Sequence, residues 1–211
     1  MPLPTVDGGF RTILADPPWR FANRHGKVAP EHGRLHRYNT MPLADICAMP
    51  VQRAAADDAH LYLWVPNALL PDGLQVMEAW GFRYVTNLPW LKRRADGGIH
   101  GGGVGWYFRN ATELLLFGVR GHLRTSEAGR RQHNVIEAPK AEHSRKPDEA
   151  YRLIEACSPG PRLELFARGR RRGWTVWGNE SDRPLRRRPV ARRAPVTGGT
   201  PALFTLTREA S

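Results

Sequence analysis

The sequence Thr12-Ile13-Leu14-Ala15-Asp16-Pro17-Pro18-Trp19 predicts a short buried strand that ends in an acid, two prolines and a tryptophan. Each proline restricts the residue before it to an extended backbone, so the chain leaves the strand, expected over about residues 11–15, in one direction. Neither proline carries an N–H group. The strand end therefore offers hydrogen-bond acceptors, namely the Asp16 carboxylate and the carbonyl groups of Asp16 and Pro17.

Such an edge suits a flat substrate that carries an amino group. Trp19 can stack on the ring while the acceptors take the two amino hydrogens of an adenine or a cytosine. The lone pair of this amine is delocalised into the ring, and two acceptors favour a tetrahedral nitrogen with a localised pair. A cofactor that carries an electrophilic methyl group could then be attacked in line, through positioning and fixed dipoles without a strong base. The alternative is an ordinary proline turn after a strand.

The Asp16–Trp19 tetrad resembles the catalytic motif of amino-methyltransferases that modify adenine at N6, specifically the MT-A family. This family includes the catalytic subunit of the eukaryotic messenger-RNA adenosine methyltransferase and many bacterial and phage relatives. The resemblance covers about residues 11–180 and implies an S-adenosylmethionine cofactor, which Asp16 also contacts. It further implies a Rossmann-like α/β methyltransferase fold in permuted order, with the catalytic residues Asp16, Pro17, Pro18 and Trp19 first and the cofactor strand last.

Apolar patterns along the chain also favour an α/β sheet with helices on both faces. We expect helices over about residues 42–49 and 67–80 and after Pro147. Thr40 is a candidate N-cap for the first of these, with Pro42 at its first position. Strands are expected at 11–15, 60–65, 82–90, 114–119, 162–168 and 174–177.

Three further candidate residues lie at the ends of predicted elements or in a polar loop. Lys92 follows a strand and matches the lysine of the family's Trp-x-Lys, which lies in the cofactor pocket; the alternative is a solvated lysine in a basic turn. Lys146 lies in a Ser-Arg-Lys-Pro-Asp-Glu segment similar to the family's Ser-x-Lys-Pro-Asp-Glu, which implies a cofactor-side or substrate-side contact. Tyr38 lies in Tyr-Asn-Thr-Met, similar to the Tyr-x-Thr-Met beside the family's target-base pocket.

Two motifs near the end of the predicted domain resemble the family's cofactor site. The segment 162–168 resembles Glu-Leu-Phe-Gly/Ala-Arg, which implies that Phe166 and Arg168 contact the cofactor. Gly178 is followed by Asn179 and Glu180, a match to Gly-Asn-Gln/Glu that implies contacts near the adenosine half. Arginines occupy positions 170 and 171, where eukaryotic members have His and Asn, so ribose contacts are not carried over to these two positions.

Composition narrows the class of protein. The 211 residues suit one methyltransferase domain over 1–180 and a basic, flexible tail over 181–211. A net charge of +12 indicates a polyanionic partner, for which nucleic acid is the usual case. Cys47 and Cys157 lack metal-type spacing, and no apolar run approaches the ~18 residues of a membrane span. We therefore expect no metal site, no membrane association and, without a signal-peptide pattern, a cytoplasmic location.

The predicted reaction is methyl transfer from S-adenosylmethionine to the amino nitrogen of adenine in a polynucleotide. DNA is favoured because a compact chain without accessory domains resembles the bacterial and phage members. RNA adenosine and the amino group of cytosine are the alternatives within the enzyme class. The alternative from another class is a catalytically silent nucleic-acid-binding partner subunit, and a partner subunit for an active enzyme is also left open.

Overall fold

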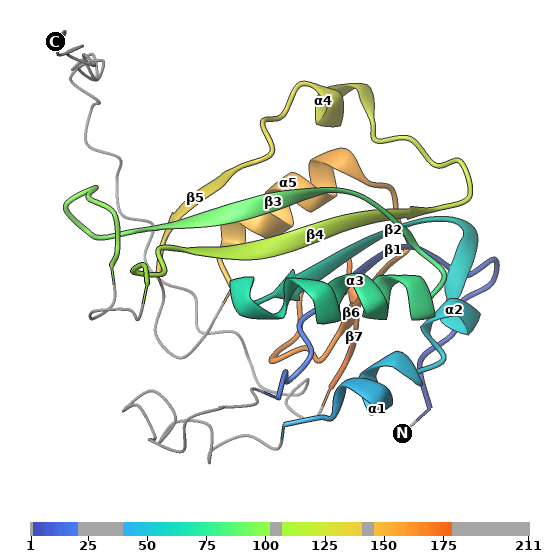
Figure 1. Cartoon of the computed structure of the whole chain (residues 1–211). Coiled ribbons are helices and arrows are strands. Elements are labelled where there is room, and N and C mark those ends of the chain that lie inside the picture. The colour runs from blue at the N-terminus through green and yellow to red at the C-terminus, as the bar shows by residue number, and fades with distance from the viewer. Residues whose placement is uncertain (1, 21–39, 102–106, 141–145, 179–211) are drawn as a thin grey trace, which may run out of the picture.

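The computed structural model describes residues 2–20, 40–101, 107–140 and 146–178. Helices connect most of the strands of the sheet over these residues, which confirms the predicted α/β class (Figure 1). The elements are β1 (Phe10–Ala15), α1 (Leu43–Cys47), α2 (Val51–Ala54), β2 (Ala55–Val65), the 3-10 helix η2 (Asn67–Leu69), α3 (Leu70–Ala79), β3 (Arg83–Arg93), β4 (Thr112–Arg120), α4 (Glu127–Arg130), β5 (Ile136–Pro139), α5 (Asp148–Cys157), β6 (Arg162–Leu165) and β7 (Thr175–Trp177).

The described strands form one sheet in the order β5-β3-β4-β2-β1-β6-β7. β1 pairs in parallel with β2 on one side and with β6 on the other, whereas β4 is antiparallel to both β2 and β3. The chain thus moves outward from β1 in one direction and later returns to its other side. In open α/β sheets, ligands bind where the strand order reverses in this way, outside the carboxyl ends of the strands. Here that point lies between β1 and β6.

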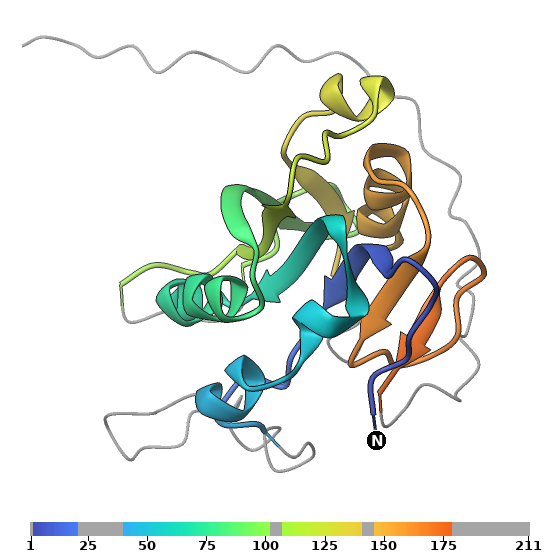
Figure 2. The same ribbon diagram turned by 90° about the vertical axis from the view of Figure 1, so that its right-hand side faces the viewer.

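Side chains alternate between two cores on opposite faces of the sheet. Ile13, Leu61 and Leu63 belong to the core that α1, α2 and α3 cover. Leu14 and Tyr62 belong to the core that α5 covers. Figures 1 and 2 show α3 and α5 on opposite sides of the strands, which confirms the prediction of helices on both faces. None of the described helices is long and apolar enough to cross a bilayer.

The prediction that Thr40 caps the first helix is wrong. Pro42 holds the N-cap position of α1, and no side chain caps this helix. Met41 forms a parallel bridge with Trp19, and its N–H donates to the Pro18 carbonyl at 2.9 Å. This bridge keeps the backbone extended beside the tetrad, so the helix begins only at Leu43. The helix expected over 67–80 begins with the 3-10 turn η2 before α3.

A buried polar network joins β2 to the end of α5. His60 Nδ1 lies 2.7 Å from the Ser158 hydroxyl, which lies 2.8 Å from the Tyr62 hydroxyl. His60 Nε2 lies 3.1 Å from the Leu123 carbonyl. Because a carbonyl only accepts, Nε2 carries the hydrogen and Nδ1 accepts from Ser158. Burial lowers the pKa of His60, so the folded protein holds the neutral ring.

We expect this network to make the stability of the protein depend on pH. The pKa of His60 is lower in the folded than in the unfolded chain, so the contribution is present above about pH 6.5 and is lost as the pH falls. His60→Phe should cost about 1–3 kcal/mol at pH 8, because Ser158 and the Leu123 carbonyl lose a partner. Urea unfolding at pH 8 and pH 5.5 should also show a weaker loss on acidification for this variant than for wild type. The exposed-site control His133→Phe should retain the wild-type pH dependence, and an equal dependence in all three proteins would contradict the assignment.

Candidate active site

β1 brings Asp16 to the carboxyl end of the sheet, where the chain turns sharply. The Trp19 N–H donates to the Pro17 carbonyl at 2.8 Å, and the Pro18 carbonyl accepts from Met41. Since the prolines carry no N–H group and the Trp19 N–H is turned back onto Pro17, residues 17–19 offer backbone acceptors and no free backbone donor. This agrees with the chemistry expected of the tetrad.

The indole of Trp19 anchors the tetrad to the end of β2. Its Nε1–H donates to the Trp64 carbonyl at 2.8 Å, and the residue is only 7% exposed. The ring packs in the core on the side of α1 and α3. Trp19 therefore fixes the position of the tetrad; stacking on a target base stays a prediction.

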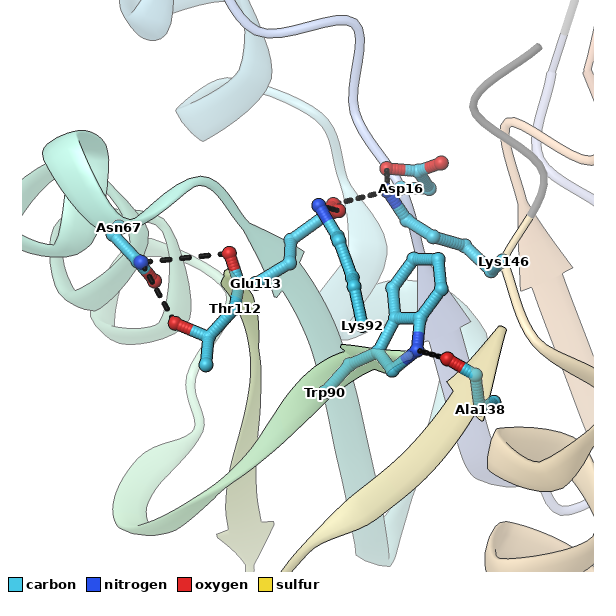
Figure 3. Close-up of polar contacts among 8 residues, drawn as sticks. All are labelled: Asp16, Asn67, Trp90, Lys92, Thr112, Glu113, Ala138 and Lys146. Carbon is cyan, nitrogen blue, oxygen red and sulfur yellow. Dashed lines mark hydrogen bonds and ion pairs between the residues drawn. The ribbon is translucent and has the colours of Figure 1, made fainter. Parts of the chain in front are cut away.

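Four charged side chains, one of them Asp16 of the tetrad, form a network in which positive and negative charges alternate (Figure 3). Lys146 Nζ lies 3.1 Å from Asp16 Oδ1 and also bonds Glu113 Oε1. Lys92 Nζ lies 3.1 Å from Glu113 Oε2. Asp16 follows β1, Lys92 is near the end of β3, Lys146 precedes α5, and Glu113 is near the start of β4. Because β4 runs antiparallel to its neighbours, its first residues reach the edge where the other strands end.

Mutual attraction offsets most of the cost of burying these charges. Burial alone would lower the pKa of Lys146, but the carboxylates of Asp16 and Glu113 outweigh it and raise that pKa. Burial alone would raise the pKa of Glu113, but the ammonium groups of Lys146 and Lys92 hold it below its usual value. At Asp16 burial dominates and the pKa is raised, since Asp16 shares Lys146 with Glu113. Asp16 is thus the carboxylate of the network that protonates first on acidification.

Two tryptophans form an aromatic floor under the lysines. Lys146 Nζ lies 5.1 Å from the ring centroid of Trp64, and Lys92 Nζ lies 5.0 Å from that of Trp90. The two rings meet edge to face with centroids 6.1 Å apart. Trp90 is fixed by a 3.0 Å hydrogen bond from Nε1 to the Ala138 carbonyl. The ring faces attract the ammonium groups and hold them near the strand ends.

A cavity opens from this network toward β6, at the point where the strand order reverses. Asp16, Lys146 and Trp64 line one side, and Phe166 and Arg168 line the other. Phe166 has a left-handed backbone, with φ of 62°, so the chain turns sharply after β6. Its ring packs edge to face on Trp177, and the Ala167 N–H donates to the Trp177 carbonyl at 3.0 Å. β7 therefore stabilises the turn that forms this wall.

The wall also carries a carboxyl group that titrates near neutrality. Glu164 accepts a 2.7 Å hydrogen bond from the Tyr151 hydroxyl. Burial raises the pKa of Glu164 to about 7. The Arg171 guanidinium lies 3.6 Å from the centroid of the Tyr151 ring and pairs with Asp148 at 2.5 Å. Arg171, which the sequence left without a role, thus covers Tyr151 at the edge of the cavity.

The polar groups of the cavity fit a zwitterionic cofactor such as S-adenosylmethionine. Lys146 can face its carboxylate and Asp16 its ammonium group. Trp64 Nε1 is buried and has no hydrogen-bond partner among the described residues, which is costly unless a ligand supplies an acceptor. The free volume is about 50 Å³, so side chains such as the exposed Arg168 must move to admit a nucleoside. No group of His, Cys, Asp and Glu suited to a metal ion occurs among the residues described.

The structure brings Asp16, Lys92 and Lys146 together and places Phe166 and Arg168 on the wall of the adjoining cavity. Three predicted site residues, Tyr38, Asn179 and Glu180, lie outside the described residues.

Glu113, which joins the two lysines, was not predicted from the sequence, and neither Trp64 nor Trp90 was predicted to belong to the site. An acid before an apolar strand is usually solvated. Only the direction of β4 shows that Glu113 belongs at this edge, so no local signal could have identified it.

Comparisons with known proteins place the site in a family context. A sequence profile of the MT-A70 family matches residues 10–180. The chain is 33% identical over 182 residues to an N(6)-adenosine-methyltransferase MT-A70-like protein of Drosophila melanogaster, covering 84% of this chain and 28% of that protein. It is 31% identical to the human N(6)-adenosine-methyltransferase catalytic subunit METTL3, covering 84% of this chain and 29% of METTL3. It is 27% identical to the type II methyltransferase M.MunI of Mycoplasma sp, covering 81% of this chain and 77% of M.MunI. The chain therefore spans less than a third of the adenosine methyltransferases and about three quarters of the type II enzyme.

We expect Glu113→Gln to destabilise the protein by about 2 kcal/mol, because it leaves two half-buried ammonium groups without their shared carboxylate. The matched control is Glu149→Gln, which breaks the exposed pair with Arg152 and should cost about 0–1 kcal/mol. Urea unfolding at pH 7.5 measures both values. Equal costs for the two variants would show that the network is not tightly coupled.

Proposed function

The chain belongs to the MT-A70 family of adenine N6-methyltransferases, and from this premise we propose that it transfers a methyl group from S-adenosylmethionine to the amino nitrogen of adenine in DNA. The observation that carries the proposal is the position of Asp16. It precedes three residues without a free backbone donor and lies beside a cavity at the point where the strand order reverses, where Lys146 holds it.

In the proposed reaction the tetrad acts on the target amine. When bound, S-adenosylmethionine supplies an electrophilic methyl group on a sulfonium. The Asp16 carboxylate and the second lone pair of the Pro17 carbonyl accept the two amino hydrogens, which localises the lone pair of the nitrogen. Lys146 keeps Asp16 in place. After the transfer the nitrogen carries one proton too many, and the raised pKa of Asp16 makes its carboxylate a suitable acceptor for that proton.

Other described residues are proposed to hold the cofactor and the base. Lys146 and Lys92 supply positive charge, and Phe166 and Arg168 form the opposite wall of the cavity. The target base must leave its stack or already be single-stranded, since the amino group has to reach Asp16. Trp19 and, outside the described residues, Tyr38 remain the proposed contacts for its ring.

The proposed substrate is DNA because the similarity extends over 77% of the type II methyltransferase. RNA is the second candidate, favoured by the higher identity to the adenosine methyltransferases. Mass spectrometry of nucleosides after incubation of the protein with DNA and with RNA decides between them. A cytoplasmic location stays part of the proposal.

A catalytically silent subunit is the rival proposal. The intact network of Asp16, Lys146 and Glu113 and the unpaired donor of Trp64 favour a site that binds the cofactor. Calorimetry with S-adenosylmethionine tests this directly, because a silent subunit with a degenerate site should give no heat.

We expect Asp16→Asn to lower the methyl-transfer rate by about 10²–10³-fold, because an amide nitrogen or a weaker acceptor replaces one carboxylate oxygen. Tritiated-methyl incorporation into a mixed-sequence substrate measures the rate. Cofactor binding should weaken only slightly, because the amide oxygen can still accept a hydrogen bond from the cofactor's ammonium group, so calorimetry separates the loss of transfer from the loss of binding. The control Asp7→Asn alters an exposed turn and should keep the parental rate. Incorporation by the Asp16 variant at the parental level would refute the role of this carboxylate.

The rate should fall on acidification with a midpoint above the usual aspartate value of about 4, because only ionised Asp16 accepts the amino hydrogens and burial raises its pKa. Glu113→Gln should move this midpoint to lower pH. The substitution removes a negative charge that raises the pKa of Asp16. It also leaves Asp16 as the carboxylate that pairs with Lys146, which lowers this pKa further. A midpoint that stays in place, or moves upward, would contradict the shared-lysine arrangement.

A further inference from the structure

A second hollow lies at the opposite end of β3 and β4 from the tetrad. Its free volume is about 390 Å³, which is large enough for a nucleotide. The first part of β3, the last part of β4 and the connection from β4 to α4 form its walls. In Figure 1 this connection rises beyond the end of β4 and leads over to α4. The reaction proposed above uses none of these residues.

The hollow is basic at its rim and apolar at its floor. Arg83, Arg124 and Arg130 line it together with His122, and no carboxylate is among the lining residues. Phe117 and other apolar side chains of the two strands form the floor. Among the described residues, no acidic side chain forms an ion pair with Arg83 or Arg124. Such a surface complements a ligand that carries negative charge beside an apolar or aromatic group.

The connecting loop is held in place without any ligand. The His122 N–H donates to the Asp58 carboxylate at 2.6 Å, and the Leu123 carbonyl accepts from His60. Ser126 donates to α5 twice, from its N–H to the Cys157 carbonyl at 2.9 Å and from its hydroxyl to the Ala156 carbonyl at 2.6 Å. The backbone that carries Arg124 is thus fixed to β2 and α5, which lowers the entropic cost of binding.

The same two strands connect this hollow to the candidate active site. β3 runs from Arg83 in the hollow to Lys92 in the charge network, and β4 runs from Glu113 in the network to Val119 in the hollow. At about 3.3 Å per residue these paths measure roughly 20–30 Å. This is about six to nine steps of a stacked, B-form strand at 3.4 Å each. β5 pairs with β3 only from Trp90 to Arg93, so no described strand covers the outer edge of β3 near the hollow.

We propose that this hollow is a second contact for the nucleic acid that carries the target base: Arg83 and Arg124 bind a backbone phosphate some six to nine nucleotides away, and the apolar floor receives the adjoining sugar or base. The inference rests on the proposed function, because it supplies the polynucleotide. It adds that the protein needs a strand long enough to reach both ends of β3 and β4, so a short oligonucleotide binds through one site only.

The test compares the double variant Arg83→Ala/Arg124→Ala with the control Arg53→Ala/Arg152→Ala, which removes the same charge from exposed positions on α2 and α5. Fluorescence anisotropy with labelled 20-nucleotide and 4-nucleotide strands, over a range of salt concentrations, measures binding without methyl transfer. For the 20-mer the first variant should bind about tenfold more weakly, at three- to fivefold per exposed arginine. Its salt dependence should fall by about 0.7 in slope, the value for one lost phosphate contact on a single strand. Arg83→Lys/Arg124→Lys should restore most of the affinity.

Binding of the 4-mer should be much less affected by the first variant than binding of the 20-mer. If methyl transfer is observed, the first variant should raise KM for the 20-mer and leave kcat unchanged. Equal dissociation constants and salt slopes for the two double variants would overturn the inference while leaving the proposed reaction intact. Failure of the wild-type protein to bind any strand would overturn both, whereas strand binding without methyl transfer would count against the reaction alone. Thermal midpoints confirm that the variants are folded.

Discussion

The ammonium group of Lys146 is the contact on which the candidate active site depends. It bonds both Asp16 and Glu113, and the carboxylate of Glu113 is shared in turn with Lys92. A single charge buried at this edge would be costly, but four charges of alternating sign largely compensate one another. The arrangement fixes Asp16, but the Lys146 ammonium group lies closer to Glu113 than to Asp16. Its ion pair with Asp16 is therefore the weaker of the two. The weaker interaction leaves the carboxylate available to a ligand, as the proposed reaction requires.

The network exists because of one reversed strand. In an all-parallel sheet the first residues of β4 would lie at the far edge, away from the ends of β1 and β3. The antiparallel direction of β4 turns Glu113 toward Lys146 and Lys92 and sends Val119 to the opposite end. The same reversal therefore builds both the charge network and one wall of the basic hollow. With both cores packed against it, the sheet acts as a rigid spacer between these two places.

Two residues of the tetrad differ in role, and the sequence alone does not show this difference. Asp16 lines the cavity, where its carboxylate can accept hydrogen bonds from a ligand. Trp19 is mostly buried and fixes the turn through its hydrogen bond to the carbonyl of Trp64. Trp64 in turn lies under Lys146 and has an unused indole N–H at the cavity. Aromatic residues that resemble ordinary core residues in the sequence thus position the charged groups, because large rigid rings hold an ammonium group without competing for its hydrogen bonds.

The sequence by itself determined the α/β class, the strand that ends at Asp16, the helices on both faces and the placement of Lys92 and Lys146 at the candidate site. These follow from local patterns, namely apolar periodicity, proline geometry and motifs of a few residues. Such patterns involve residues close together in the chain, so they can be recognised without the fold. The tertiary structure alone decided the strand order, the direction of β4 and the place of Glu113. Each of these is a pairing between segments far apart in the chain. The free energy of such a pairing depends on which charges and backbone groups meet across the sheet, and that is fixed only when the chain has folded.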